Sequence, residues 1–293
     1  MRTVDAALLP MADAIDAIEA ALWDGLDPEA DPARSFVDTG AGQVFFMPSS
    51  ARSYAGVKLV TVAPGNAKLN LPRVQGVYVL FDAATLTPLA LLDGAALTSL
   101  RTPAVSAVAV RHLSTADSAR LLVFGTGPQA CGHVEAVRAV RPVEHVDVVG
   151  RRPGPVAEFV ARCRAAGLPA DAATPTDVSR ADIVCCCTTA RVPLFDSARL
   201  ADHATVVAMG SHEPDAREVD VDLVRRATTV VESRSSALRE AGDIIRAGLV
   251  PLATIDELVR GEASADPGRP RLFKSTGMAW EDLVVAAAAY QRA

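Results

Sequence analysis

The sequence predicts an α/β protein in which a doubly wound parallel sheet follows a smaller α+β domain. From Ala119 onward, short and nearly continuous apolar runs alternate with helical segments, a pattern typical of parallel strands covered by helices on both faces. Before Ser114, short segments alternate between apolar and polar residues, as antiparallel strands do. A length of 293 residues agrees with roughly two domains.

The first domain is expected over residues 1–114. It begins with an amphipathic helix over residues 5–26, in which Ile15, Ile18 and Leu22 recur at helical spacing. Short strands and a further helix follow, and the strongest strand pair is expected to form an antiparallel hairpin. The expected strands are Gln43–Met47, Gly56–Val62, Gln75–Asp82 and Thr87–Asp93, and the helix is 102–113.

The second domain is expected over residues 115–275, as alternating strands and helices. The expected strands are 120–124, 145–149, 182–187, 205–208 and 228–231, the helices are 128–140 and 153–166, and Gly261–Arg271 is expected to be a polar loop. A last helix, Ala279–Arg292, is apolar enough to need a partner surface. Residues 276–293 are therefore expected to complete the first domain or to contact another subunit.

Composition excludes several classes of protein. Half of the residues are hydrophobic, 22% are charged and the net charge is −6, which argues against nucleic acid or an anionic membrane as the main partner. No apolar run approaches the 18 or so residues of a membrane helix, and Asp5, Asp13 and Asp16 are unlike a secretory signal. The five cysteines have no metal-ligand spacing, so no metal site is expected. We expect them to be reduced thiols in a cytoplasmic protein.

A glycine-rich motif lies at the start of the second domain. The run Leu121–Phe124 is followed by Gly125-Thr126-Gly127-Pro128-Gln129-Ala130, the strand–GxGxxA–helix form of the dinucleotide-binding fingerprint. Gly125 permits the tight turn, Gly127 allows a pyrophosphate to approach the backbone, and small Ala130 permits close helix packing. The helix start offers free N–H groups to the phosphates. The motif therefore predicts a Rossmann-type domain that binds a nicotinamide dinucleotide.

The end of the second strand of this domain bears on the choice of cofactor. About 25 residues after Gly125 the chain has Gly150-Arg151-Arg152, where an acidic residue would bind the ribose hydroxyls of NAD. The two arginines suit a 2′-phosphate instead. Asp147 lies too early in the strand for this role. NADPH (NADP) is favoured and NAD is the alternative, since both arginines would also be compatible with a solvated helix start.

Several motifs resemble those of the ornithine cyclodeaminase/mu-crystallin family. The main ones are Leu97–Ala107, Gly125–Ala130 and Phe273–Asp282, and shorter ones are Met47-Pro48, Gly56-Val57-Lys58, Gly210–Glu218 and Gly242-Asp243. They span nearly the whole chain in family order. The resemblance is therefore specific for the family and much less specific for the activity, because the family includes cyclodeaminases, imine reductases, an alanine dehydrogenase type and a hormone-binding crystallin.

The resemblance implies a Rossmann-type domain and a substrate-binding and dimerisation domain that the C-terminal helix completes. It also implies a homodimer, and an active site between the domains where the nicotinamide meets a small amino or imino acid. The cofactor-binding residues expected from the motifs and the resemblance are Thr102, Gly125, Thr126, Gly127, Pro128, Gln129, Ala130, Arg151, Arg152, Thr188, Met209, Gly210, Ser211 and Ser275.

The resemblance also implies three substrate-site residues. Arg34 and Arg101 resemble a clamp for the substrate carboxylate, which a guanidinium binds with two parallel hydrogen bonds, and Lys58 would lie close to the reacting carbon. Lys58 is in an otherwise apolar strand, so from the residues alone it is either a proton donor with a lowered pKa or a lysine whose amine reaches solvent. The resemblance favours the catalytic interpretation.

One position departs from the ornithine-cyclising members of the family. Those members have an aspartate two residues beyond the glycine after the fourth Rossmann strand, thought to handle the substrate amine. Here Met209-Gly210-Ser211 is followed by His212. A histidine would not hold a second, cationic amine, but it can donate a proton near neutral pH. The alternatives are that His212 is only a loop residue, or that Glu213 replaces the aspartate.

These observations predict an NADPH-dependent reductase of a small 2-imino acid, cyclic or acyclic, whose reverse reaction is amino-acid dehydrogenation. Arg34 and Arg101 would hold the substrate, and Lys58 or His212 would keep its nitrogen protonated. The alternatives are an ornithine or lysine cyclodeaminase that uses bound NAD, and a crystallin-like protein that binds NADPH and a small ligand without turnover.

Overall fold

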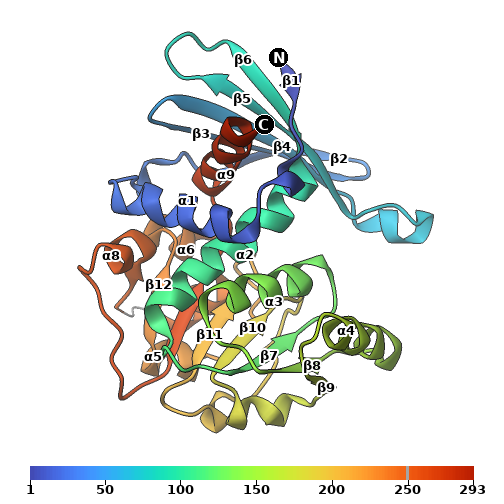
Figure 1. The fold of residues 1–293 in the computed structure, drawn as a ribbon, viewed down its shortest axis with the longest axis vertical. Coiled ribbons are helices and arrows are strands. Elements are labelled where there is room, and N and C mark those ends of the chain that lie inside the picture. Colours follow the sequence, from blue (N-terminus) through green and yellow to red (C-terminus); the bar gives the residue numbers. More distant parts are fainter. Residues whose placement is uncertain (249–250) are drawn as a thin grey trace. The chain divides into compact units, whose positions relative to one another are not determined.

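The computed structural model describes residues 1–248 and 251–293. The chain divides into two compact units, one formed by residues 1–105 with 278–293 and the other by residues 106–277 (Figure 1). The long helix α2 (Gly94–Leu113) runs through the division. The boundary expected after residue 114 follows the end of this helix, whereas the compact units divide within it.

The first unit is built on a six-stranded sheet with the order β1-β6-β5-β4-β3-β2. The short β1 pairs with β6 in parallel and the other neighbours are antiparallel, including the expected hairpin. Helix α9 (Ala279–Arg292) packs on β3, β4 and β5, and α1 (Met11–Trp23) packs on α9. The strands are β1 (Arg2–Thr3), β2 (Ser35–Thr39), β3 (Gly42–Ala51), β4 (Tyr54–Val62), β5 (Val74–Asp82) and β6 (Pro88–Asp93).

The two faces of this sheet differ. Met47, Lys58, Tyr78 and Leu92 form one row across four strands, and all four side chains are buried on the face that α9 covers. The opposite face is also apolar but only partly covered. Its residues include Phe46, Val57, Leu59, Val77 and Val79.

The second unit contains an eight-stranded sheet with the order β13-β12-β14-β11-β10-β7-β8-β9, in which all neighbours are parallel. Its strands are β7 (Arg120–Phe124), β8 (His145–Val149), β9 (Ala170–Ala172), β10 (Ile183–Cys186), β11 (Thr205–Ala208), β12 (Thr228–Val231), β13 (Ala253–Thr254) and β14 (Arg271–Lys274). Its further helices are α3 (Pro128–Val140), α4 (Pro153–Ala165), α5 (Val221–Arg226), α6 (Arg234–Glu240), α7 (Gly242–Ala247) and α8 (Ile255–Val259).

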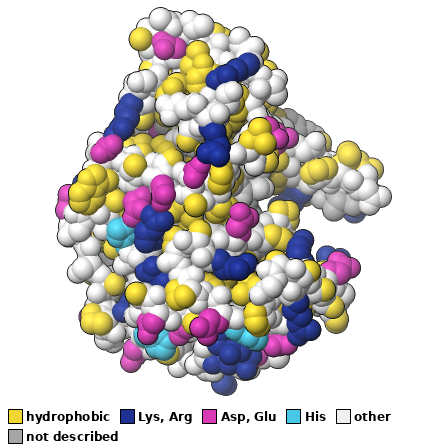
Figure 2. All heavy atoms as spheres, in the orientation of Figure 1, with side chains coloured by type: hydrophobic (Ala, Val, Ile, Leu, Met, Phe, Trp, Pro, Cys, Tyr) yellow, Lys and Arg dark blue, Asp and Glu magenta, His cyan; other side chains and the backbone are white. Residues whose placement is uncertain are grey.

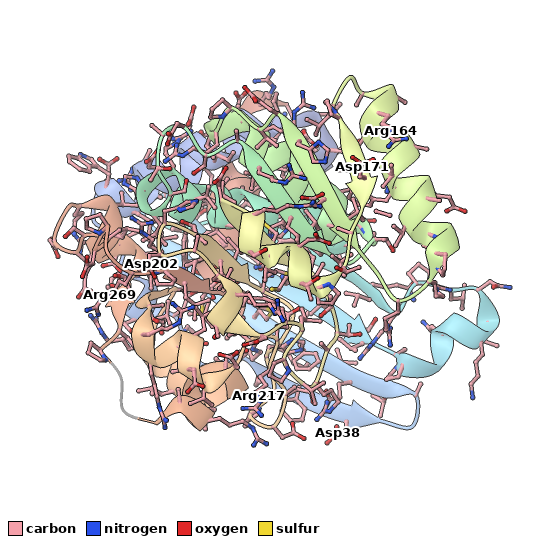
Figure 3. The ribbon with its side chains drawn as sticks, turned by 90° about the horizontal axis from the view of Figure 1, so that it is seen from below. Asp38, Arg164, Asp171, Asp202, Arg217 and Arg269 are labelled. Atoms are coloured by element: carbon pink, nitrogen blue, oxygen red, sulfur yellow. The ribbon has the colours of Figure 1, made fainter. Side chains whose placement is uncertain are left out.

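The sheet of the second unit is hydrophobic at its centre and held by ion pairs at its edge. Strand residues such as Leu122, Val184 and Val206 are buried in one core cluster. At the β9 edge, Arg164 of α4 lies beside Asp171, with 2.6 Å between Nη2 and Oδ1 (Figure 3). The predicted α/β class is therefore confirmed: a doubly wound parallel sheet accompanies a smaller α+β unit.

Two predicted helices have different bounds in the structure. The helix expected over residues 5–26 is shorter, because Pro10 has no N–H to continue a helix; α1 starts after it, and Ala6–Leu8 forms a separate 3-10 turn. The helix expected from Thr102 begins earlier, at Gly94, where the side chain of Asp93 accepts hydrogen bonds from the N–H groups of residues 95 and 96. Pro103 is typical of a first turn but here lies inside α2.

Candidate active site

The glycine-rich loop joins β7 to α3 in the second unit. Gly125 has φ +110°, and a Cβ there would lie 2.4 Å from the carbonyl oxygen of Cys187, so only glycine fits this turn. Gly127 precedes the first residue of α3, and no heavy atom lies within 4 Å of a Cβ built on it. The exposed backbone and the N–H groups at the start of α3 therefore fit a pyrophosphate, and Ala130 is buried.

The strand order places this loop at the centre of the sheet. Strands β9-β8-β7-β10-β11 follow the order 3-2-1-4-5, and the last strand of the chain, β14, is inserted between β11 and β12. In sheets of this order a dinucleotide crosses the carboxyl ends of the strands where the order reverses. A Cβ at Gly150 would lie 3.3 Å from Cγ2 of Thr126, so the loop after β8 adjoins the glycine-rich loop. Arg151 and Arg152 follow Gly150 and are exposed.

Asp147, the acidic residue of β8, has other partners. Its side chain is fully buried and forms ion pairs with Arg120 (Nε–Oδ2 2.7 Å) and Arg180 (Nη2–Oδ1 3.0 Å). The carboxylate is thus held among arginines inside the strand rather than at its carboxyl end. Between the end of β8 and Glu158, the chain contains two arginines and no acidic residue. This segment therefore offers cations, and no carboxylate, to the adenosine ribose of a dinucleotide.

The loops after β10, β11 and β14 contain the other expected cofactor residues of the second unit. Thr188 and Gly210 each donate hydrogen bonds to the buried carboxylate of Glu218, whose pKa burial raises to about 7. Met209 donates its N–H to the carbonyl of Cys186. The hydroxyl of Ser211 donates to the carbonyl of Ala216 (2.6 Å), and that of Ser275 donates to Glu232 (2.6 Å).

Lys58 lies at the centre of the first unit's sheet, on the face covered by α9. Its side chain is 2% exposed, and Nζ lies 2.6 Å from Oδ2 of Asp282 and 3.3 Å from Oγ1 of Thr98. Burial lowers the pKa of Lys58 to about 8, although the charge of Asp282 opposes this shift. Of the two interpretations left open by the sequence, the one in which the amine of Lys58 reaches solvent is wrong, because the side chain is buried.

Arg101 joins the same cluster from α2. Its Nη1 donates to Oε2 of Glu281 (2.5 Å), and its Nε lies 3.3 Å from Oδ1 of Asp282. Arg101 and Thr98 are three residues apart on one helix face, while Glu281 and Asp282 lie in the first turn of α9, where carboxylates are favoured by the helix dipole. Asp282 therefore contacts both candidate site cations, one with each oxygen.

The segment that contains Arg34 is fastened to the same turn of α9. The N–H of Trp280 donates to Oδ2 of Asp31 (2.6 Å), and burial raises the pKa of this carboxyl. Arg34 itself lies just before β2 and is half-buried. Tyr78, the neighbour of Lys58 across β4 and β5, is fully buried, and burial raises its pKa well above the ordinary value.

The sequence interpretation named Lys58 and Arg101 but assigned no role to their carboxylate partners. Glu281 and Asp282 were visible only as the end of a family motif. The available signal was physical: a lysine and an arginine buried in one apolar unit need counter-ions, and consecutive acidic residues at the start of an apolar helix are candidates. Thr98 and Glu218 likewise lie within family motifs, without an assigned role, and Asp31 lies in none of the motifs.

His212 lies in the loop after β11 in the second unit, and its side chain is exposed. The neighbouring Glu213 is also on the surface, where its Oε2 lies 2.6 Å from Nη1 of Arg191. The same arginine pairs with Asp215. Glu213 is thus already engaged by a cation of its own unit.

Over residues 1–248 and 251–293, no group of His, Cys, Asp or Glu residues has the arrangement of a metal site. All five cysteines are free thiols, with Cys163, Cys185 and Cys186 buried. Among the helices that the structure describes, none is both long and apolar enough to cross a membrane.

The glycine-rich loop and the strand order of the second unit are those of a dinucleotide-binding α/β protein. The first unit contains a buried cluster in which Lys58 and Arg101 contact Glu281 and Asp282. The chain belongs to the ornithine cyclodeaminase/mu-crystallin family, whose sequence model matches residues 3–293.

Three similar proteins are informative. The Δ1-pyrroline-2-carboxylate reductase 2 of Burkholderia ambifaria is 37% identical over 249 residues, which cover 83% of this chain and 78% of that protein. The structure of the Δ1-pyrroline-2-carboxylate reductase of Thermococcus litoralis, in complex with NADH and L-proline, has a TM-score of 0.93 at 29% identity and covers 100% and 97% of the two chains. An archaeal alanine dehydrogenase dimer with bound NAD has a TM-score of 0.92 at 28% identity, covering 99% and 95%.

Proposed function

We propose that the chain is an NADPH-dependent reductase of a small cyclic 2-imino acid, with Δ1-pyrroline-2-carboxylate as the first candidate substrate and L-proline as its product. The observation that carries this proposal is the buried pair of Lys58 and Arg101, joined through Asp282. It supports the proposal because an amine with a pKa of about 8 lies near a guanidinium, a group able to bind a carboxylate. The reductases of B. ambifaria and T. litoralis, similar over most of their length, support the same activity.

In this mechanism Arg101, together with Arg34, binds the carboxylate of the imino acid and fixes the plane of the C=N bond. The ammonium of Lys58 donates a proton to the imine nitrogen, so that the electron pair of the C=N bond can move onto nitrogen. A bound reduced nicotinamide supplies the hydride to the imine carbon. His212 is the second candidate proton donor. The protein contributes orientation and electrostatics.

Cofactor choice is proposed from the loop after β8. A nicotinamide dinucleotide fits the glycine-rich loop, and the T. litoralis and archaeal relatives were solved with NADH and NAD. We infer a preference of this chain for NADPH, because Arg151 and Arg152 are exposed next to that loop and Asp147 is committed to Arg120 and Arg180.

Cyclodeamination is the less supported alternative. It needs a carboxylate for the distal amine of ornithine, where this chain has His212. Glu213, which had been considered as a replacement, is paired with Arg191 on the surface. A purely ligand-binding role is also less supported, because buried titratable groups with perturbed pKa values, such as Lys58, are concentrated at catalytic sites.

We also propose a homodimer formed through the partly covered face of the first unit's sheet. Phe46 is 37% exposed, and its apolar neighbours on that face include Val57, Leu59 and Val79. Contiguous exposed apolar patches are typical of protein interfaces. The similar archaeal alanine dehydrogenase is a dimer.

The test of the function compares two reactions of the purified protein. We expect NADPH oxidation with Δ1-pyrroline-2-carboxylate, and much less with 2-oxo acids plus ammonia or methylamine. We expect little ammonia from ornithine with added NAD. Conversion of ornithine to proline at an ordinary enzymatic rate, without imine reduction, would reject the proposal in favour of cyclodeamination. NADPH binding without turnover of any imine would favour the crystallin-like alternative.

A further inference from the structure

A buried carboxylate ties together two loops at the carboxyl end of the second unit's sheet. Glu218 is fully buried, and its Oε1 accepts hydrogen bonds from the N–H (3.0 Å) and the hydroxyl (2.6 Å) of Thr188. Its Oε2 accepts from the N–H of Gly210 (2.6 Å). Thr188 follows β10 and Gly210 follows β11, so one side chain holds the ends of two neighbouring strands.

The two loops are in close contact where Glu218 holds them. A Cβ built on Gly210 would lie 1.8 Å from the carbonyl oxygen of Thr188 and 2.7 Å from Oε1 of Glu218. On the other side of β10, a Cβ built on Gly125 would lie 2.4 Å from the carbonyl oxygen of Cys187. The loop after β10 is thus packed between the glycine-rich loop and Gly210, and a shift of either neighbour would move it.

A second buried pair fixes Glu218 from behind. Asp243 accepts hydrogen bonds from the N–H groups of Glu218 (2.8 Å) and Val219 (3.0 Å), and it lies 3.2 Å from Nζ of Lys274. Lys274 also donates to the carbonyl of Ser211 (2.5 Å). The segment from Gly210 to Val219 is therefore fastened at both ends by buried charges, with His212 next to the fastened Ser211.

The strand order indicates which part of a bound dinucleotide would lie near the loops after β10 and β11. The pyrophosphate lies at the loop after β7, and the ribose of the adenosine half lies at the end of β8. The two halves of the cofactor extend in opposite directions from the point where the order reverses. The nicotinamide half of a bound dinucleotide would therefore lie toward β10 and β11, whose loops Glu218 joins.

We propose that Glu218 is a positioning residue for the nicotinamide half of the cofactor, acting through Thr188 and Gly210 rather than by contact with substrate. Only the kinetic test of this inference rests on the proposed function. Two backbone N–H groups and one hydroxyl donate to the two carboxyl oxygens of Glu218. The amide of a Glu218→Gln variant has a single acceptor oxygen and would turn its NH2 group toward Thr188 or Gly210, so at least one buried donor loses its partner.

The test compares two ligands, NADPH and 2′-phospho-ADP-ribose, which lacks the nicotinamide. Loss of a buried charge-assisted hydrogen bond in Glu218→Gln is expected to weaken NADPH binding about tenfold or more, with binding of 2′-phospho-ADP-ribose unchanged. Glu218→Asp keeps the charge and should recover part of the affinity. The matched control is Glu144→Gln, which removes an exposed carboxylate just before β8, at the opposite end of the sheet. Calorimetry measures all four proteins.

Kinetics with 4-deuterated NADPH give an independent reading. In Glu218→Gln we expect kcat for imine reduction to fall and its deuterium isotope effect to rise, because a misplaced nicotinamide slows hydride transfer itself. A purely structural role would reduce the amount of active enzyme, leaving the isotope effect and the ratio of the two ligand affinities as in the unmutated protein. That result, or equal weakening of both ligands, would overturn the proposal.

A second variant and the two-ligand comparison distinguish failure of this proposal from misfolding and from failure of the proposed function. If Glu218→Gln does not fold, Thr188→Val removes one hydroxyl donor at nearly constant volume, and the same selective loss of NADPH affinity is expected on a smaller scale. If the unmutated protein reduces no imine, the proposed function fails, yet the two-ligand comparison still decides the role of Glu218.

Discussion

At the scale of single residues, the first unit holds a small, balanced set of buried charges. Lys58 and Arg101 face Glu281 and Asp282 within one cluster. Burying two cations is costly unless each is paired, and the first turn of α9 supplies both counter-ions. Because Asp282 contacts Lys58, its negative charge opposes the lowering of the Lys58 pKa by burial.

The pKa of Lys58 has a direct kinetic consequence. Burial lowers it to about 8, so the ammonium form, the proton donor for reduction, is lost as the pH rises through about 8. We expect kcat for imine reduction to fall above this pH and the rate of proline oxidation to rise. In Asp282→Asn, the removed negative charge no longer raises the pKa, so the falling limb should move to lower pH. Stopped-flow pH profiles of both proteins check this, and an unmoved limb would assign the proton to another group such as His212.

The arginines after β8 make a second residue-scale prediction. Arg151→Ala combined with Arg152→Ala should weaken NADPH binding about tenfold or more, since a charge-assisted phosphate contact contributes roughly 1.5–3 kcal/mol. NADH binding should change little. Fluorescence titration with both cofactors measures the difference. Equal losses for the two cofactors, or tighter binding of NADH by the unmutated protein, would contradict the NADPH preference.

At the scale of elements, the sequence predicted best where local pattern and buried environment agree. Strands β7, β8, β11 and β12 and helix α3 have the expected bounds, because their apolar runs and turn residues are unambiguous. Strand β14 was not identified, although it lies between β11 and β12. It has only four residues and is bounded by Arg271 and Lys274, which look like loop residues until their buried partners are known.

The candidate site was predicted only where its residues have a local sequence signature. The glycine-rich loop has a local signature, so its residues could be named from the sequence. The counter-ions of Lys58 come from more than two hundred positions away, on α9. The contact between Lys58 and these counter-ions depends on tertiary packing. It cannot be predicted from the periodicity or the spacing of residues in the sequence.

The contact of α2 with α3 yields a stability prediction. The ring of His133 is fully buried; Nδ1 donates to the carbonyl of Gln129 (2.7 Å), and Nε2 accepts from the hydroxyl of Ser106 (3.0 Å). Burial lowers its pKa to about 4. Because the folded pKa lies below the unfolded value of 6.5, the stabilisation is present above about pH 6.5 and lost as the pH falls through 4, roughly 3 kcal/mol in all.

Urea unfolding from pH 7 to pH 4.5 checks this prediction. In His133→Gln, the free energy of unfolding should be lower at pH 7 and should decline less steeply with acid than in the unmutated protein. His203→Gln is the control, since that ring is about half exposed. Identical slopes for His133→Gln and the unmutated protein would contradict the assignment.

At the scale of the whole molecule, the sheet of the first unit presents a second apolar face. Exposed Leu69 and Leu71 between β4 and β5 add to the surface hydrophobicity of this unit, and Figure 2 shows hydrophobic side chains at the surface of that segment. A lone domain of this size would gain from covering such a face. The proposed second copy of the chain would cover it.

The homodimer is tested by a charge placed on that face. We expect light scattering to give the mass of two chains at micromolar concentration. Val79→Glu should shift the protein toward the monomer, because a carboxylate would be buried without a partner. Leu238→Glu is the control, since Leu238 is 54% exposed on α6 of the other unit. A monomeric unmutated protein would refute the proposed dimer.

The position of α9 in the chain affects the order in which the protein matures during translation. The first unit comprises residues 1–105 and 278–293, so its last helix leaves the ribosome only after all of residues 106–277. The second unit is continuous and can fold as it emerges, with its glycine-rich loop complete. Until α9 arrives, Lys58 and Arg101 lack their counter-ions and the apolar face above them is open. A chain that ends after Gly277 would therefore keep the glycine-rich loop but lack both counter-ions of Lys58 and Arg101, and the apolar face of its first segment would be exposed to aggregation.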